Sequence, residues 1–132
     1  MEIDKTNQTI NLKDDRTLGY AEYGDPIGYP VFLFHGNPGS RLSWGLIPGS
    51  PFLLGLHLIA PDRPGYGLTD FKPYALENWP TDITELADHL GINKFAVFGP
   101  SGGGPFALAC AWKIPNRLTA VGVFGSEGRI QA

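Results

Sequence analysis

One serine lies between glycines at the point where an apolar strand is followed directly by an apolar helix. Residues 95–107 read Phe-Ala-Val-Phe-Gly-Pro-Ser-Gly-Gly-Gly-Pro-Phe-Ala, so Gly99, Ser101 and Gly103 occupy the fixed positions of a G-x-S-x-G pattern. A turn this tight forces its middle residue into a strained backbone conformation, and glycine two residues to either side lets the flanking chains pass closely. The segment therefore predicts that Ser101 is presented as a nucleophile.

The length and composition of the chain limit the setting in which such a serine works. The sequence has 132 residues, which suffices for one domain with a single core, and we expect residues 1–132 to form that one domain. Hydrophobic residues make up 42% and charged residues 17% of the chain. No apolar stretch approaches the about 18 residues that span a bilayer. The sequence thus predicts a globular protein without a membrane partner.

Charge and cysteine content favour a cytoplasmic protein that does not bind nucleic acid. The net charge is −3, and the basic residues are scattered from Lys5 to Arg129 with no cluster for a phosphate backbone. The N-terminus lacks the basic start and apolar stretch of a secretory signal, and the single Cys110 cannot form an intramolecular disulfide. No group of His, Cys and Asp has metal-ligand spacing, so we expect neither a metal nor a cofactor.

Apolar runs bounded by turn residues predict the strands. Thr9–Leu12 and Thr17–Tyr23 alternate in polarity and predict a hairpin of two edge strands. Four continuous apolar runs predict strands buried on both faces of a parallel sheet. These runs are Val31–Phe34, Leu58–Ala60, Phe95–Phe98 and Ala120–Phe124.

Three segments between these strands favour helices. A short helix capped by Ser40 is expected over Ser40–Leu46, and Leu76–Leu90 carries apolar residues at helical spacing. Pro105–Lys113 is almost wholly apolar and predicts a buried helix that ends before Pro115. The alternation of strands and helices predicts an α/β fold, in which an antiparallel hairpin leads into a parallel sheet of about six strands in all, with helices on both faces.

Three motifs each follow one of the predicted buried strands. His35-Gly-Asn-Pro-Gly-Ser40 follows the first, Asp62-Arg-Pro-Gly-Tyr-Gly67 the second, and Gly99–Gly103 the third. Parallel strands bring their carboxyl ends to one edge, where open α/β sheets bind ligands. In this order and spacing the motifs resemble the N-terminal half of an α/β-hydrolase, from the broad bacterial group with HGxPGS, DRPGYG and GxSGGG loops.

The resemblance implies a serine-dependent hydrolase that cleaves a small-molecule ester, thioester or amide through an acyl-enzyme. Serine needs a base to become a good nucleophile, and the tetrahedral oxyanion needs donors already in position. The resemblance assigns Ser101 as nucleophile and the backbone N–H groups of Asn37 and Gly102 as oxyanion donors. A serine at this position argues against the dehalogenase and epoxide-hydrolase branches, which place an aspartate there.

The sequence offers no evident base for Ser101. In the resembled family the histidine follows the last strand and the acid follows the sixth or seventh, whereas this sequence stops just past its sixth predicted strand. His57 and His89 are expected towards the opposite edge of the sheet, and His35 is expected to shape the oxyanion loop. Glu127 follows the sixth strand and is either the triad acid or a solvated loop carboxylate.

Other functions of these segments are less well supported. Gly102–Ala107 matches the G-x-G-x-x-A pattern of dinucleotide-binding folds, but Gly99–Ser101 separates it from the strand and Pro105 has no N–H for a pyrophosphate. A P-loop is excluded because no Lys-Ser or Lys-Thr follows the glycines. We therefore expect no nucleotide here.

Several further side chains are expected to have structural roles. Arg63 is predicted to brace its loop in a salt bridge. Cys110 is predicted to pack in the core. The three tryptophans, Trp44, Trp79 and Trp112, are predicted to be core or cap contacts because their rings suit partly buried helix faces.

Two hypotheses about activity follow. In the first, the chain is the partial hydrolase domain that bears the nucleophile, and a C-terminal half supplies the histidine. In the second, it is a non-catalytic truncated module. Either way, Ala120–Phe124 is expected to keep an unpaired edge beside uncovered apolar faces, which predicts a homo-oligomer or a complementing half.

Overall fold

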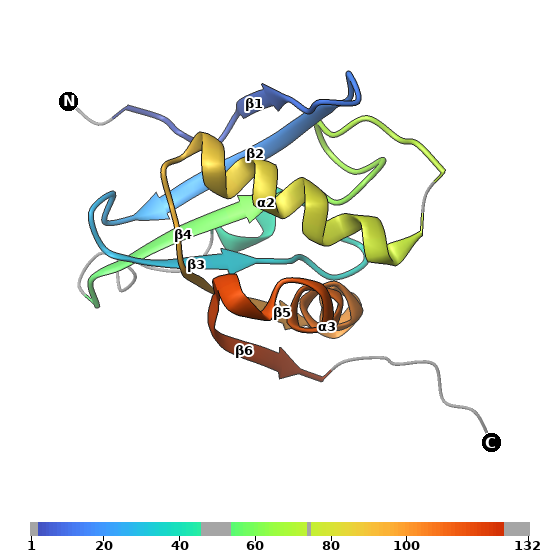
Figure 1. Ribbon diagram of the computed structural model, residues 1–132. Coiled ribbons are helices and arrows are strands. Elements are labelled where there is room, and N and C mark those ends of the chain that lie inside the picture. Colours follow the sequence, from blue (N-terminus) through green and yellow to red (C-terminus); the bar gives the residue numbers. More distant parts are fainter. Residues whose placement is uncertain (1–2, 46–53, 74, 126–132) are drawn as a thin grey trace.

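The computed structural model describes residues 3–45, 54–73 and 75–125. Within these ranges six strands form one sheet in the order β1-β2-β4-β3-β5-β6, with β1 and β6 at opposite edges (Figure 1). The strands are β1 Gln8–Asn11, β2 Thr17–Gly24, β3 Tyr29–Leu33, β4 Leu56–Pro61, β5 Phe95–Pro100 and β6 Leu118–Phe124. The α-helices are α2 Trp79–His89 and α3 Gly104–Lys113, and the 3-10 helices are η1 Arg41–Trp44, η2 Leu76–Asn78, η3 Ser101–Gly103 and η4 Pro115–Arg117.

The sheet is antiparallel at one side and parallel at the other. β2 pairs antiparallel with both β1 and β4, whereas β3 pairs parallel with β4 and β5, and β5 pairs parallel with β6. The predicted hairpin is confirmed, but the expectation of two edge strands is wrong for β2. Its second edge pairs with β4 from Tyr20 opposite Pro61 to Gly24 opposite His57. Alternating polarity shows that one face is buried, and it carries no information about how many neighbours a strand has.

Side chains of alternate strand residues build a core on each face of the sheet. On one face, Phe32, Ile59 and Val97 pack with Trp79 of α2 and Cys110 of α3. Figure 1 shows α2 running across the strands on this face. The fold class predicted from the sequence, a hairpin followed by parallel strands with helices on both faces, is confirmed once the opposite face is included.

The opposite face carries the smaller core and the helix η1. Leu33, Leu58 and Ala60 are buried there, and Trp44 of η1 packs against them. The expected short helix is present in 3-10 form, and the Ser40 side chain accepts the N–H of Leu42 as its cap.

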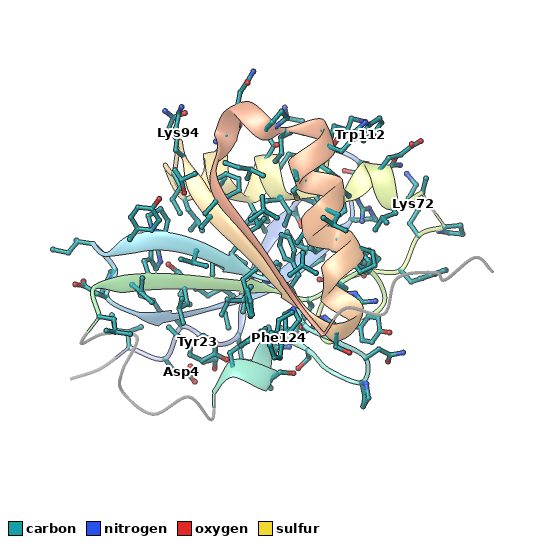
Figure 2. The ribbon with its side chains drawn as sticks, turned by 90° about the horizontal axis from the view of Figure 1, so that it is seen from below. Asp4, Tyr23, Lys72, Lys94, Trp112 and Phe124 are labelled. Atoms are coloured by element: carbon teal, nitrogen blue, oxygen red, sulfur yellow. The ribbon has the colours of Figure 1, made fainter. Side chains whose placement is uncertain are left out.

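The α3 and β6 side of the molecule is more exposed than the sequence predicts. Leu108 and Trp112 of α3 are 54% and 71% exposed, and Phe124 of β6 is 73% exposed. Figure 2 shows Trp112 on the outside of its helix. The predictions of a buried α3 and a doubly buried β6 are therefore wrong, and for Trp112 the core alternative of the predicted core or cap contact is wrong. Apolar runs reveal which faces avoid water, and none of the described segments covers these faces.

Candidate active site

The three sequence motifs meet at one edge of the sheet. β4, β3 and β5 are consecutive neighbours and run parallel, so the segments that follow them emerge at the same end. These segments are residues 34–40 after β3, residues 62–67 after β4, and residues 101–103 after β5. The geometry of this edge determines what the chain can do chemically.

Ser101 has the strained backbone that its motif predicts. Its φ is 52°, in the left-handed region that non-glycine residues rarely adopt. A Cβ on Gly99 would lie 2.1 Å from the carbonyl oxygen of Gly103, and a Cβ on Gly103 would lie 1.9 Å from that of Phe34. Both glycines are required by close backbone approach, which holds the exposed Ser101 at the start of η3 and α3.

The backbones of Gly102 and Asn37 lie side by side next to this turn. The Cβ position of Gly102 is 3.4 Å from the backbone nitrogen of Asn37, and the Cβ position of Gly36 is 3.4 Å from the Cβ of Ser101. The structure thus brings together Ser101, Gly102 and Asn37, three of the residues predicted from the sequence. The fourth, Glu127, lies outside the described residues.

His35 is buried beneath the same loop, and both of its ring nitrogens are engaged. Nδ1 is 2.8 Å from the carbonyl oxygen of Gly36, and Nε2 accepts the backbone N–H of Arg63 at 3.0 Å. A carbonyl oxygen only accepts, so Nδ1 carries the proton and the ring is neutral. Burial also lowers the pKa of His35, which favours the neutral form. The Nε2 lone pair is therefore not available to receive the proton of Ser101.

The other two histidines lie away from the serine. His57 is near the start of β4, and its Nε2 is 2.6 Å from Oε1 of Glu22. His89 ends α2 and precedes β5, whereas Ser101 follows the far end of β5. The six residues of β5 span about 20 Å at about 3.3 Å per residue. The positions predicted for both histidines are confirmed, and neither is placed to act on Ser101.

Asp62 anchors the loop after β4 as a fully buried carboxylate. Its Oδ1 accepts the backbone N–H of Arg41 at 2.6 Å, and its Oδ2 accepts Arg41 Nη1 and the N–H of Leu68, both at 2.9 Å. A Cβ on Gly67, whose φ is 51°, would lie 2.2 Å from Oδ2. Glycine therefore lets the loop wrap around the charge. Sequence analysis missed Arg41 as the partner, because the two residues are far apart in the sequence and Arg41 lies outside the three motifs.

Arg63 joins the loops at the centre of this edge. Its Nη1 donates to the carbonyl oxygen of His35 at 2.9 Å and lies 3.4 Å from the Cβ position of Gly102. The guanidinium carbon is 4.3 Å from the ring centroid of Phe106 and 5.0 Å from that of Tyr66. The predicted bracing role fits these contacts, a hydrogen bond to a carbonyl oxygen and two aromatic contacts, and the predicted salt bridge of Arg63 stays a prediction. They place a positive charge beside Gly102.

The described ranges contain neither a candidate metal cluster nor a helix that could span a membrane. Residues 3–45, 54–73 and 75–125 contain no group of three or more His, Cys, Asp or Glu side chains able to hold a metal ion. In the same part of the chain, every helix is too short or too polar to reach across a bilayer.

Comparison with known sequences agrees with this geometry. Residues 29–126 match the family described as alpha/beta hydrolase fold. The chain is 33% identical over 117 residues to an uncharacterised hydrolase of Saccharomyces cerevisiae, a match that covers 85% of this chain and 39% of that protein. It is 32% identical over 126 residues to lipase 1 of Psychrobacter immobilis, a match that covers 92% of this chain and 39% of the lipase. The chain thus spans about two fifths of the length of these curated relatives.

Solved structures lead to the same family. A carboxylesterase structure from Nitrososphaera gargenis superposes with a TM-score of 0.82 at 24% identity, covering 94% of this chain and 47% of that one. A thermophilic esterase from Thermogutta terrifontis gives a TM-score of 0.76 at 27% identity, and the match covers 98% of this chain and 47% of the esterase. These structures share the fold of the chain, and the family match over residues 29–126 shows that the chain belongs to the α/β-hydrolase fold family.

Proposed function

We propose that this chain bears the nucleophile and the oxyanion donors of a serine hydrolase that cleaves a small-molecule ester, thioester or amide through an acyl-enzyme. The observation that carries the proposal is the φ of 52° at Ser101, held by the close packing of Gly99 and Gly103. A non-glycine residue in this region costs about 1–3 kcal/mol and persists where the surroundings enforce it. Such strain clusters at functional sites.

The proposed reaction uses the residues at the carboxyl edge of the sheet. Ser101 Oγ attacks the carbonyl carbon of the substrate while a base takes its proton. The oxyanion that forms accepts hydrogen bonds from the N–H groups of Gly102 and Asn37, and the N-terminal end of α3 adds its dipole. Collapse of the intermediate returns the proton to the leaving alcohol, thiol or amine. Water then hydrolyses the acyl-serine by the same steps.

We propose that the base is a histidine supplied by a complementing C-terminal half. His35 donates from Nδ1 and accepts at Nε2, and His57 is paired with Glu22. The chain matches only about two fifths of its curated relatives. In this proposal Glu127 is the acid that orients the incoming histidine, as a triad requires.

The residue at position 101, and not the names of the relatives, favours ester chemistry over dehalogenation. One relative is named a lipase, and another, from Mycobacterium tuberculosis, is named a haloalkane dehalogenase and is 30% identical over 115 residues. The serine at position 101 favours the esterase type, and we assign the chain to the bacterial group with HGxPGS, DRPGYG and GxSGGG loops. We further propose a cytoplasmic location, since a chain whose single cysteine, Cys110, cannot form an intramolecular disulfide fits a reducing compartment.

A second candidate function rests on the exposed side of the sheet. Among the described strands β6 has a neighbour on one edge only, and its Phe124 and Trp112 of α3 are exposed. Unpaired edges and apolar patches favour association. The alternative is thus a non-catalytic module that pairs through β6 with a second copy or another chain. The same surface would receive the complementing half under the first proposal.

Covalent labelling of Ser101 distinguishes the two candidates. The purified chain is incubated for hours with excess fluorophosphonate, and intact mass is recorded for the parent, for Ser101→Ala, and for Ser43→Ala as a matched exposed serine. We expect a single adduct that forms slowly on the parent and on Ser43→Ala, because the oxyanion donors are in place and the base is not, and none on Ser101→Ala. No adduct on the parent, or an adduct that persists in Ser101→Ala, contradicts the proposed nucleophile.

A further inference from the structure

A cavity of about 310 Å³ lies on the helix side of the carboxyl edge of the sheet. Its walls combine apolar side chains with two cations, and none of its lining residues is acidic. The residues that matter here are Tyr66, Phe71, Leu76 and Phe106 for the apolar surface, and Arg63 and Lys72 for the charge. Its volume is at the lower end of the range for small-molecule sites, about 300–1,000 Å³.

Arg63 connects this cavity to the serine turn. Its Nη1 lies 3.4 Å from the Cβ position of Gly102, and the rings of Tyr66 and Phe106, 5.0 and 4.3 Å from the guanidinium carbon, also line the cavity. Phe106 belongs to α3, the helix that begins just after Ser101. A molecule in the cavity therefore lies beside the reacting residues.

The second cation, Lys72, is only loosely neutralised. Its Nζ is 3.5 Å from Oδ2 of Asp14, whereas Arg16 Nε holds the same oxygen at 2.9 Å. One carboxylate oxygen thus serves two cations, and half of the Lys72 side chain remains exposed. Because Arg63 also lines the cavity and no lining residue is acidic, the cavity presents a positive potential to whatever enters it.

We propose that this cavity binds the anionic, apolar end of the substrate, a carboxylate carried on an aromatic ring. The ring packs against Phe71, Leu76 and Phe106, whose exposed surface it removes from water. The carboxylate faces Arg63 and Lys72. The cavity volume of about 310 Å³ accommodates one ring with a short linker. The assignment of this ligand as a substrate group rests on the proposed function, whereas the binding itself does not.

The test compares two probes with the same body and different charge. The ¹⁵N-labelled chain is titrated with 3-phenylpropionate and with 3-phenylpropionamide, and amide shifts give both the site and the Kd. We expect the carboxylate to bind about fivefold more tightly, as for a partly exposed ion pair. Shifts should centre on the amides of Phe71, Leu76 and Phe106. At about 1 M salt the Debye length is about 3 Å, so the charge is screened and the two probes should bind with nearly equal affinity.

Matched lysine variants locate the charge. Lys72→Gln is expected to reduce the preference for the carboxylate at least twofold, and Lys94→Gln, on the far side of the molecule in Figure 2, should leave it unchanged. The inference is overturned if the two probes bind with equal affinity or if the amide shifts centre elsewhere. It is also overturned if Lys72→Gln and Lys94→Gln change the preference for the carboxylate equally. Ser101→Ala should bind 3-phenylpropionate as the parent does. If 3-phenylpropionate binds but fluorophosphonate does not label Ser101, the result counts against the proposed function. If Ser101 is labelled but 3-phenylpropionate does not bind, the result counts against this cavity.

Discussion

His35 Nε2 accepts the backbone N–H of Arg63 at 3.0 Å, a bond that joins the loop after β3 to the loop after β4. Only the neutral ring can make it, because a protonated imidazole has no lone pair left at Nε2. The same ring contacts Tyr66 edge-on at 4.9 Å between centroids. The position of Asn37, two residues further along, depends on this anchor.

This bond predicts a dependence of stability on pH. Burial lowers the pKa of His35 in the folded state below its unfolded value of about 6.5. The unfolded chain then binds more protons than the folded chain below that pH, so the free energy of unfolding falls as the pH drops from 7.5 towards 5. Urea denaturation at fixed pH values measures the slope. We expect the slope to be smaller in His35→Gln, and an unchanged slope would contradict the role of His35.

The glycines of the serine turn should tolerate no side chain. A Cβ on Gly103 would lie 1.9 Å from the carbonyl oxygen of Phe34, which is backbone and cannot move aside without shifting β3. We expect Gly103→Ala to lose about 3 kcal/mol of stability or more, at the upper end of overpacking costs. Gly45→Ala is the control, because its Cβ would meet Leu42 O at 3.4 Å and its φ is −67°. Thermal unfolding of the two variants side by side checks this difference.

Much of this architecture could be predicted from local sequence, and the errors share one physical cause. Apolar runs identified the strands, and the glycines around Ser101 identified the turn, since both signals lie within a few residues. The place of β2 inside the sheet, the Arg41–Asp62 pair and the exposure of Trp112 depend on segments distant in sequence. A local pattern shows that a side chain is apolar or charged, and it does not identify the segment that packs against it.

The buried pair of Arg41 and Asp62 is expected to matter more than its surface counterpart. Asp62→Asn leaves the Arg41 guanidinium, whose side chain is 8% exposed, without its buried counter-charge. Such a loss costs about 3–5 kcal/mol. Asp88→Asn removes the partner of Arg117 at the surface, where the carboxylate is 63% exposed, and should cost about 0–1 kcal/mol. Equal urea midpoints for the two variants would show that the Asp62 carboxylate does not anchor its loop.

The free edge of β6 predicts self-association. Among the described strands its outer edge has no partner, and Val121 within β6 is 40% exposed. We expect a dimer by size-exclusion chromatography that dissociates on dilution, and a shift to monomer in Val121→Lys, because a charge on an edge strand opposes pairing. Ile27→Lys, at a residue that is 92% exposed in the turn before β3, should elute as the parent does. A parent that stays monomeric at every concentration argues against pairing through β6.

The isolated chain is expected to hydrolyse an activated ester such as p-nitrophenyl acetate slowly, with little contribution from Ser101. None of the three histidines is placed to deprotonate the hydroxyl, since His35 is neutral with both nitrogens engaged and the others lie towards the opposite end of β5. Hydrolases that lose their triad keep about 10³–10⁴-fold acceleration from the oxyanion donors and binding. Water attack assisted by the N–H groups of Asn37 and Gly102 would account for turnover here. Ser101→Ala should therefore change the rate less than twofold, within about 0.4 kcal/mol of barrier. A large drop would show that a base already acts on Ser101 within this chain, and the proposal of a complementing histidine would then fail.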